Sequence, residues 1–405
     1  MATTDDISLA RGWHHDWITA LGLSIGAAVA LGFSRFAYAL LLPPMRDALG
    51  LSYFDAGALN SANAVGYLFG AICTTLPICR NRPSIFFLSS LTVSAVALLL
   101  LAATSNFTML LLLRTVGGAA TAFTFILGAA LAGMIETTGK PARSGILVGL
   151  YVAGASLGIV LSGIAVPVAL MDVHQGWRNG WITLGVIALL GILPAYHATQ
   201  RVVIKHTGAP TKLSIKEMIR LTPTFLGYGL FGAGYVGYMT FIIAFLNAHE
   251  GDNGWAIAFW IILGSISAIS NLLWGSVLGQ MPQGFGPASV FMLSMVGTLP
   301  ALIWLGPTST LLSAVIFGGS FLAGPAAITI LAKKQLPSSA LTAGVALLTT
   351  AFAFGQAIGP LLSGMVTDIT GNLAAGIWVS PVLLGLAAVI NLLQKSAPAE
   401  EQAPH

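Results

Sequence analysis

The stretch Gly154-Ala-Ser-Leu-Gly158-Ile-Val-Leu-Ser-Gly163 decides the fold, because the chain contains it twice. The second copy is Gly355-Gln-Ala-Ile-Gly359-Pro-Leu-Leu-Ser-Gly364, which lies 201 residues further on. Other features recur at an offset of 200 or 201: Gly117-Gly118 and Gly318-Gly319, Trp177 and Trp378, Gly32 and Gly232, and Tyr38 and Tyr238. Shared spacing in separate regions indicates an internal duplication, which is a plan that many transporters use.

The composition excludes most classes of soluble protein. Of the 405 residues, 56% are hydrophobic and only 7% are charged, against about 25% charged in an average soluble domain. Thirteen acidic and 17 basic residues cannot form the polar shell of a soluble enzyme or the basic patch of a nucleic-acid binder. Two cysteines cannot form a disulfide framework. The chain is therefore predicted to be an integral membrane protein.

Apolar runs of about 20 residues, the length a helix needs to cross a bilayer, set the fold class. Twelve occur, at 18–42, 55–78, 84–104, 107–134, 144–170, 178–197, 222–247, 255–279, 287–305, 309–332, 341–367 and 373–394. They are too long for the strands of a membrane barrel. We predict an all-α integral membrane protein with twelve transmembrane helices in two pseudo-symmetric six-helix bundles. The predicted parts are a tail at 1–17, a bundle at 18–197, a linker at 198–220, a bundle at 221–394 and a tail at 395–405.

Charge bias predicts the orientation of these helices, because basic residues favour the cytoplasmic side. With the N-terminus inside, 13 basic residues fall in cytoplasmic segments and only Arg46 and Arg178 fall outside. Both termini are then cytoplasmic, in a bacterial-type inner membrane, and the polar start carries no signal-peptide pattern. Five of the 13 lie in 198–220. They either bind anionic lipid headgroups or only determine the topology.

Several motifs resemble those of the major facilitator superfamily. Arg114-Thr-Val-Gly117-Gly118 resembles the Arg-x-x-x-Gly motif of its fourth helix, and the two glycine-rich copies resemble its fifth- and eleventh-helix motif. Gly32-Phe-Ser-Arg35-Phe-Ala-Tyr38 and Asn60-Ser-Ala-Asn63-Ala-Val-Gly66-Tyr67 resemble the YbfB/YjiJ-type branch. The resemblance implies a secondary transporter in which two bundles rock around a central substrate site. One departure is the loop Pro77-Ile-Cys79-Arg80-Asn81-Arg82-Pro83, which lacks the acidic residue usual in the family.

Arg35 and Arg114 are the main candidates for substrate binding. Both fall within apolar runs, where a charged side chain is costly and normally faces the bundle interior or a wet cavity. Two such cations repel each other unless an anion or water screens them. We expect Arg35 to contact the substrate. For Arg114, substrate contact and a structural role, such as binding backbone carbonyls, both remain open.

The acidic residues determine which substrate class these arginines favour. All 13 fall either at the outer ends of predicted helices or in segments on the cytoplasmic side, and no histidine lies in the middle of a helix. An anionic substrate would supply the missing charge, and the planar guanidinium fork suits carboxylate or phosphate. Organic-phosphate antiporters of this superfamily pair a first-helix arginine with a second one in helix seven. Here the repeat places Tyr235 there, so a carboxylate fits better.

Further polar and aromatic residues within the runs are candidates for the same site. Tyr38 shares a helix face with Arg35 by its spacing, and buried amides need partners. The substrate-binding set is Arg35, Tyr38, Asn63, Tyr67, Arg114, Tyr235, Tyr238, Asn271 and Gln356. Small residues let helices approach closely, so we assign gating or packing roles to Gly117, Gly154, Gly158, Gly355, Gly359 and Pro360.

The function predicted from these features is secondary active transport of a small, carboxylate-type organic anion by alternating access. Coupling would be anion exchange or symport with a proton. The alternatives are efflux of drugs or other hydrophobic compounds and, less favoured, a non-transporting membrane sensor. No nucleophile–base pair, metal cluster or phosphate-binding loop occurs, so we expect no enzyme activity, no metal and no cofactor. The expected partners are the substrate and the lipid bilayer, not nucleic acid, and the expected working form is a monomer.

Overall fold

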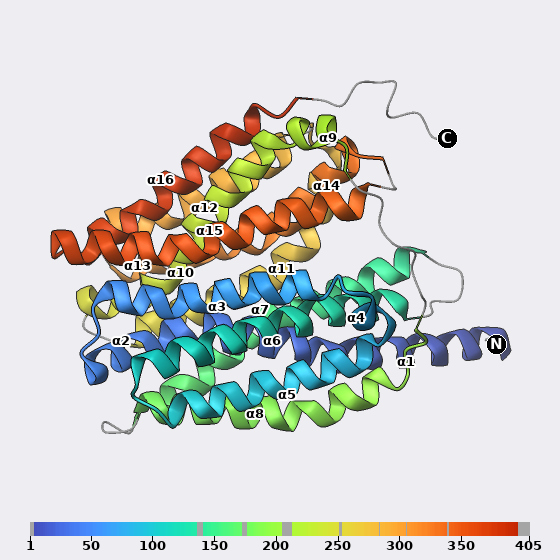
Figure 1. Cartoon of the computed structure of the whole chain (residues 1–405), viewed down its shortest axis with the longest axis horizontal. Coiled ribbons are helices and arrows are strands. Elements are labelled where there is room, and N and C mark those ends of the chain that lie inside the picture. The colour runs from blue at the N-terminus through green and yellow to red at the C-terminus, as the bar shows by residue number, and fades with distance from the viewer. Residues whose placement is uncertain are drawn as a thin grey trace. The chain divides into compact units, whose positions relative to one another are not determined.

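The computed structural model describes residues 4–135, 141–171, 176–204, 213–250, 253–282, 284–304, 306–337 and 340–395. Within these ranges the secondary structure is entirely helical (Figure 1). The expected all-α architecture is therefore confirmed. The chain forms two compact units, residues 1–38 with 66–207 and residues 39–65 with 208–405. The second unit thus takes in a segment from the first half of the sequence.

Each unit has its own set of helices (Figure 1). The first contains α1 (Thr4–Ala27), the π-helix η1 (Ala28–Phe36), α4 (Pro77–Asn81), α5 (Pro83–Ala102), α6 (Phe107–Met134), α7 (Pro141–Ala169) and α8 (Gly176–Thr199). The second contains most of α2 (Tyr38–Leu49), and α9 (Ile215–Arg220), α10 (Thr222–Glu250), α11 (Asn253–Gln280), α12 (Phe285–Ile303), α13 (Pro307–Gly318), the 3-10 turn η2 (Phe321–Ala323), α14 (Gly324–Gln335), α15 (Leu341–Thr370) and α16 (Leu373–Leu392). Helix α3 (Tyr53–Cys73) is divided between the units after Val65.

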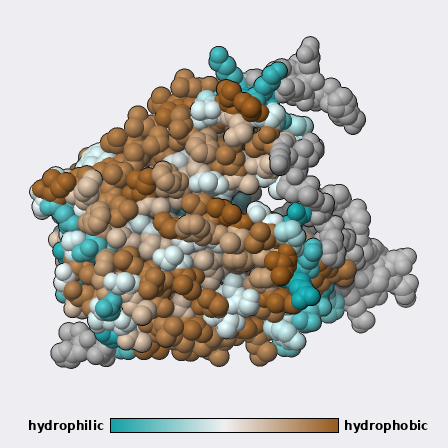
Figure 2. All heavy atoms as spheres, viewed as in Figure 1, coloured by the Kyte–Doolittle hydropathy of each residue, from teal (hydrophilic) through white to brown (hydrophobic). Residues whose placement is uncertain are grey.

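Eleven helical segments of the described chain are long and apolar enough to cross a membrane. Helix α3 has 21 residues and supplies a twelfth helix of comparable length. Its lower hydropathy follows from Asp55, Asn60 and Asn63, which lie in its first half. Figure 2 shows apolar side chains over much of the helix surface, with hydrophilic ones mostly near helix ends. Fully solvated proteins rarely expose so much contiguous apolar surface, so the chain is a multi-pass membrane protein.

The two glycine-rich copies pack in the same way. An added Cβ at Gly154 or Gly158 of α7 would meet the backbone of Ser24 or Ala28 in the first helix. In the second half, an added Cβ at Gly355 or Gly359 of α15 would meet the backbone of residues 229 and 233 in α10. The duplication seen in the sequence therefore places a close backbone contact of the first helix in both halves, at positions where an added Cβ would lie 2.4 Å or less from a carbonyl oxygen.

Two of the predicted spans, the first and the tenth, depart from the boundaries expected from hydropathy. Helix α1 begins at Thr4 rather than near residue 18. The first span changes to a π-helix at Ala28. The run at 309–332 is broken between α13 and α14. The carbonyl of Gly319 at this break accepts a hydrogen bond of 2.7 Å from Trp274 Nε1.

The loop after α11 has no charge of its own, and Lys334 of α14 supplies one. Its ammonium group donates to the carbonyls of Gly279 at 3.0 Å and Met281 at 2.7 Å. A cation at this point stabilises the last carbonyls and the negative end of the helix dipole. On the linker, Ser214 and Glu217 form a capping box at the start of α9. Residues 205–212 of the linker lie outside the described residues.

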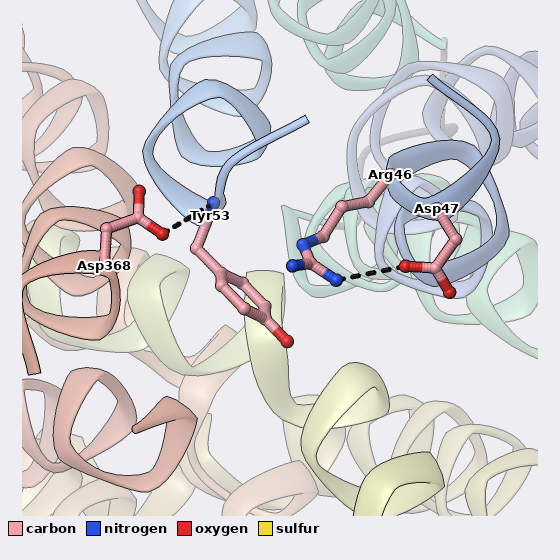
Figure 3. A network of polar contacts seen from close by, with 4 residues as sticks. All are labelled: Arg46, Asp47, Tyr53 and Asp368. Carbon is pink, nitrogen blue, oxygen red and sulfur yellow. Dashed lines mark hydrogen bonds and ion pairs between the residues drawn. The ribbon is translucent and has the colours of Figure 1, made fainter. Parts of the chain in front are cut away.

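The start of α3 is held by Asp368 of α15, within the second unit (Figure 3). The Asp368 carboxylate accepts from the backbone N–H groups of Tyr53 at 3.0 Å and Phe54 at 2.8 Å. Arg46 forms an ion pair with Asp47 and lies 3.9 Å from the centre of the Tyr53 ring. The first N–H groups of a helix have no partner within it. Asp368 therefore caps a helix from a distant part of the sequence.

We expect Gly158→Ala to destabilise the protein, because its methyl group would overlap the backbone of Ala28. Overpacking of this kind costs about 1–3 kcal/mol. The matched control is Gly149→Ala on the same helix, where nothing lies within 4 Å of an added Cβ. The measurement is the thermal unfolding midpoint of each purified variant in detergent. Equal midpoints for the two variants would contradict the account of helix packing.

We expect Asp368→Ala to lower the unfolding midpoint, because two N–H groups of α3 lose their acceptor. Loss of a helix cap costs about 1 kcal/mol. Asp368→Asn should fall between this variant and the wild type, since its amide oxygen still accepts. The control is Asp47→Asn, which removes a surface ion pair with Arg46 and should change little. A midpoint for Asp368→Ala as high as that of the control would refute the capping role.

Candidate functional site

Arg35 lies in the π-helix η1 and is buried, with only 5% of its surface exposed. Its guanidinium carbon lies 5.4 Å from the centre of the Tyr67 ring in the same unit. Its Nε is buried and has no hydrogen-bond partner among the described residues. Within the described chain, the ion pair recorded joins Arg46 and Asp47, so no described acidic side chain pairs with Arg35. The structure therefore places an uncompensated cation inside the first unit.

Arg114 of α6 is also buried, but its guanidinium group has partners. Its Nη1 donates to the carbonyl oxygen of Ser34 at 2.5 Å. The guanidinium carbon lies 4.6 Å from the centre of the Tyr38 ring and 5.9 Å from that of Trp181. Of the two roles left open by the sequence, binding of a backbone carbonyl is present in this structure. Arg114 and Arg35 still lie close enough to interact electrostatically.

The candidates in the first unit therefore form one group. Tyr38 stacks on Trp181, with ring centres 6.4 Å apart, and both rings lie beside Arg114. The buried Trp181 Nε1, like Arg35 Nε, has no acceptor among the described residues. Buried donors without acceptors are costly. A ligand that binds here would gain by presenting acceptor oxygens.

In the second unit, Tyr235 and Gln356 are hydrogen-bonded. The Gln356 amide nitrogen donates to the Tyr235 hydroxyl oxygen, and both side chains are buried. Gln356 Oε1 is buried and accepts no hydrogen bond from the described residues. The Tyr235 ring packs among aromatic neighbours, 5.4 Å from Phe231 and 5.6 Å from Phe352 between ring centres. The pair thus offers one buried acceptor within an otherwise apolar cluster.

Tyr238 is fully buried, and its hydroxyl is already engaged. It donates to Ser313 Oγ at 2.6 Å, and Ser313 in turn donates to the carbonyl oxygen of Gly297 at 2.6 Å. This chain of hydrogen bonds joins α10, α13 and α12. In this conformation the Tyr238 hydroxyl serves helix packing, and its predicted contact with the substrate stays a prediction.

The remaining polar candidates lie in the second unit. Asn63 is buried in α3, and Asn271 is half-buried in α11 with its Nδ2 lacking an acceptor among the described residues. One turn before Asn63, Asn60 donates to Thr240 Oγ1 at 2.7 Å. The structure thus gives Asn60 a packing partner in α10. The substrate contacts predicted for Asn63 and Asn271 stay predictions.

The glycines assigned to gating differ in how closely they are packed. Gly154, Gly158, Gly355 and Gly359 touch neighbouring backbones, and the carbonyl of Pro360 lies against Gly57. Gly117 is looser, because an added Cβ would have its nearest neighbour, the Ala97 Cβ, at 3.7 Å. Close packing is a property of these positions in this structure. Movement at them during transport stays a prediction.

Two features of the site were not predicted from the sequence. Trp181 lies in an ordinary apolar run, and only its position beside Arg114 marks it. The π-helix has no sequence signal, because its residues also fit an α-helix. Among the described residues, no group of three or more His, Cys, Asp or Glu side chains is placed to hold a metal ion. The arrangement supplies hydrogen-bond donors and positive charge rather than metal ligands.

Comparison with known proteins matches the chain to membrane transporters. A family model described as "Uncharacterised MFS-type transporter YbfB" matches residues 27–392. The chain is 26% identical to a chloramphenicol resistance protein of Streptomyces lividans, over 92% of this chain and 97% of that one. It is 24% identical to the uncharacterized MFS-type transporter YtbD of Bacillus subtilis, over 90% and 92% of the two chains.

A solved structure shares the fold. It is a bacterial homologue of the human lysosomal transporter Spinster, in an inward-facing and unoccupied conformation, with a TM-score of 0.72 at 14% sequence identity. The match covers 95% of this chain and 96% of that one. Since the family model spans most of the sequence, the chain belongs to the YbfB-type family of the major facilitator superfamily, whose members are membrane transporters rather than enzymes.

Proposed function

We propose that the protein transports a small organic anion of the carboxylate type by alternating access, with Arg35 as the residue that binds its charge. The observation that carries the proposal is the state of Arg35. It is buried, its Nε lacks a hydrogen-bond partner, and no described acidic side chain pairs with it. A buried charge normally has a partner or marks a substrate path. A bound carboxylate would supply that partner.

The surroundings of Arg35 favour an anion over a cation or a metal. Arg114 adds a second positive charge to the same unit, but its guanidinium group already binds the Ser34 carbonyl. A bound anion would relieve the repulsion between the two cations. The fork of an arginine can hold both oxygens of a carboxylate. Tyr67 and Trp181 offer ring surface and a free donor in the same unit.

The second unit holds the neutral candidates of the proposed substrate-binding set. Gln356 and Tyr235 are the strongest of these because they form a buried polar pair. Asn63 and Asn271 complete the proposed set, and Tyr238 is the weakest because its hydroxyl is bound to Ser313. The glycine contacts of α7 and α15 would serve as surfaces on which helices move during gating.

Coupling would be anion exchange or symport with a proton carried by the substrate. Charge bias supports the proposed cytoplasmic position of both termini. The inner-membrane location and the monomeric working form belong to the same proposal and rest on the family resemblance.

Efflux of drug-like compounds is the second candidate. It rests on the relative from Streptomyces lividans named as a chloramphenicol resistance protein, which matches this chain over nearly its whole length. The aromatic cluster of α10, α12 and α15 would suit an aromatic compound. The two candidates differ in the charge of the substrate, so one set of measurements separates them.

We expect Arg35→Gln to reduce exchange of radiolabelled carboxylates in proteoliposomes by about 10- to 100-fold, the effect of losing hydrogen bonds from a charged group. Arg35→Lys should retain part of the activity, because it keeps the charge but loses the fork. The control is Arg46→Gln, which changes an arginine that already has an acidic partner and should leave exchange unchanged. The substrate panel is acetate, lactate, benzoate and chloramphenicol.

Two results would contradict the proposal. Carboxylate exchange by Arg35→Gln at the wild-type rate would show that the anion binds elsewhere. Transport of chloramphenicol but of no carboxylate, together with raised chloramphenicol resistance in cells that express the protein, would replace the anion proposal with efflux.

A further inference from the structure

We propose that Arg114 is a positioning residue, which holds the π-helix Ala28–Phe36 in the register that presents Arg35. This inference rests on the proposed function only for the identity of the ligand. Its structural part concerns the path of the first membrane span, and it can be tested without any substrate.

The π-helix determines which way Arg35 points. The segment has nine residues, and the N–H of Ala37 donates to the carbonyl of Gly32, five residues back, at 2.9 Å. Each α-helical residue turns the chain by about 100°, and a π-helical turn accommodates extra chain. Conversion of the segment to a regular α-helix would therefore change the phase of Arg35. The Arg35 side chain would then no longer lie on the helix face that meets Tyr67.

The segment is held at both ends within the first unit. Near its start, Gly158 of α7 touches the backbone of Ala28 and also lies against Gly32. Near its end, Arg114 of α6 donates to the carbonyl of Ser34. That carbonyl belongs to the peptide group that joins Ser34 to Arg35. Arg114 thus fixes the peptide immediately before the proposed substrate ligand.

The hydrogen bond from Arg114 is suited to this task. The Arg114 and Ser34 side chains are 2% and 3% exposed, so water competes little, and a charged donor forms a stronger bond than a neutral one. The Tyr38 ring, two residues after the π-helix, lies against the same guanidinium group at 4.6 Å. π-Helical turns are rare and frequently occur at functional sites. Loss of the Arg114 contact should therefore let the segment relax.

The test measures which residues of the first span are accessible, and so which way the helix faces. Cys73 and Cys79 are first changed to Ser and Ala. Single cysteines are then placed one at a time between residues 29 and 37, omitting Gly32 and Arg35, and their rates of alkylation by a small charged thiol reagent are measured. In Arg114→Gln, we expect the most reactive position to move by one residue or more along the chain. Arg114→Lys, which keeps a donor but loses the fork, should show a smaller shift.

Arg178→Gln is the matched control. Arg178 belongs to the same unit and also donates to a backbone carbonyl, that of Ala102, but that carbonyl lies at the end of α5. We expect its alkylation pattern to equal that of the wild type. An unchanged pattern in Arg114→Gln would overturn the inference. If Arg114→Gln does not purify as a folded protein, the alkylation patterns of Arg114→Lys and Arg178→Lys are compared instead. A shift in Arg114→Lys alone supports the inference, and an unchanged pattern in both variants overturns it.

The second measurement is binding of benzoate, used as the probe anion. We expect Arg114→Gln to bind it about tenfold more weakly or worse, and to have no further effect in the Arg35→Gln background. A shifted alkylation pattern with unchanged benzoate affinity would overturn the positioning role. If wild type binds no carboxylate and the pattern still shifts, the anion proposal fails while the control of helix register by Arg114 stands.

Discussion

The cost of burying two guanidinium groups among apolar helices governs the functional part of this structure. Arg114 meets that cost with the Ser34 carbonyl and the faces of Tyr38 and Trp181. Arg35 has only the Tyr67 ring as a described partner. Arg114 therefore serves the fold, whereas Arg35 remains available to a ligand. Transporters use such unneutralised groups because substrate binding then supplies what the empty protein lacks.

Close backbone contact is the second constraint, because helices in a bilayer gain little from the hydrophobic effect and depend on packing and hydrogen bonds. Glycines of α7 and α15 bring their helices against the first helix of their own half. In the first unit this contact reaches the π-helix that carries Arg35. Packing and ligand binding are therefore linked through one segment. The duplicated sequence provides the contact twice, whereas the arginines found buried among the described residues, Arg35 and Arg114, both lie in the first half.

Much of this architecture could be predicted from the sequence, because apolar length and small-residue spacing act locally. The helical spans, the duplication and the burial of Arg35 followed from these patterns. The π-helix could not be predicted, since it depends on contacts from α6 and α7 that no local pattern encodes. The capping of α3 by Asp368 joins residues more than 300 positions apart. Hydropathy predicts that Asp368 lies at a helix end, but it does not predict which helix the carboxylate caps. The role of Arg114 stayed open for the same reason: its partner is a backbone carbonyl, which every residue has.

The most direct test of the central claim is thermal stabilisation of the purified protein by a panel of small carboxylates, neutral metabolites and lipophilic cations. A ligand that binds only the folded state raises its stability with the logarithm of concentration over the dissociation constant. Stabilisation of the wild type by carboxylates, and its loss in Arg35→Gln, is the predicted result. Equal stabilisation of both proteins by carboxylates, or stabilisation by lipophilic cations alone, would contradict the account of Arg35 as the anion-binding residue.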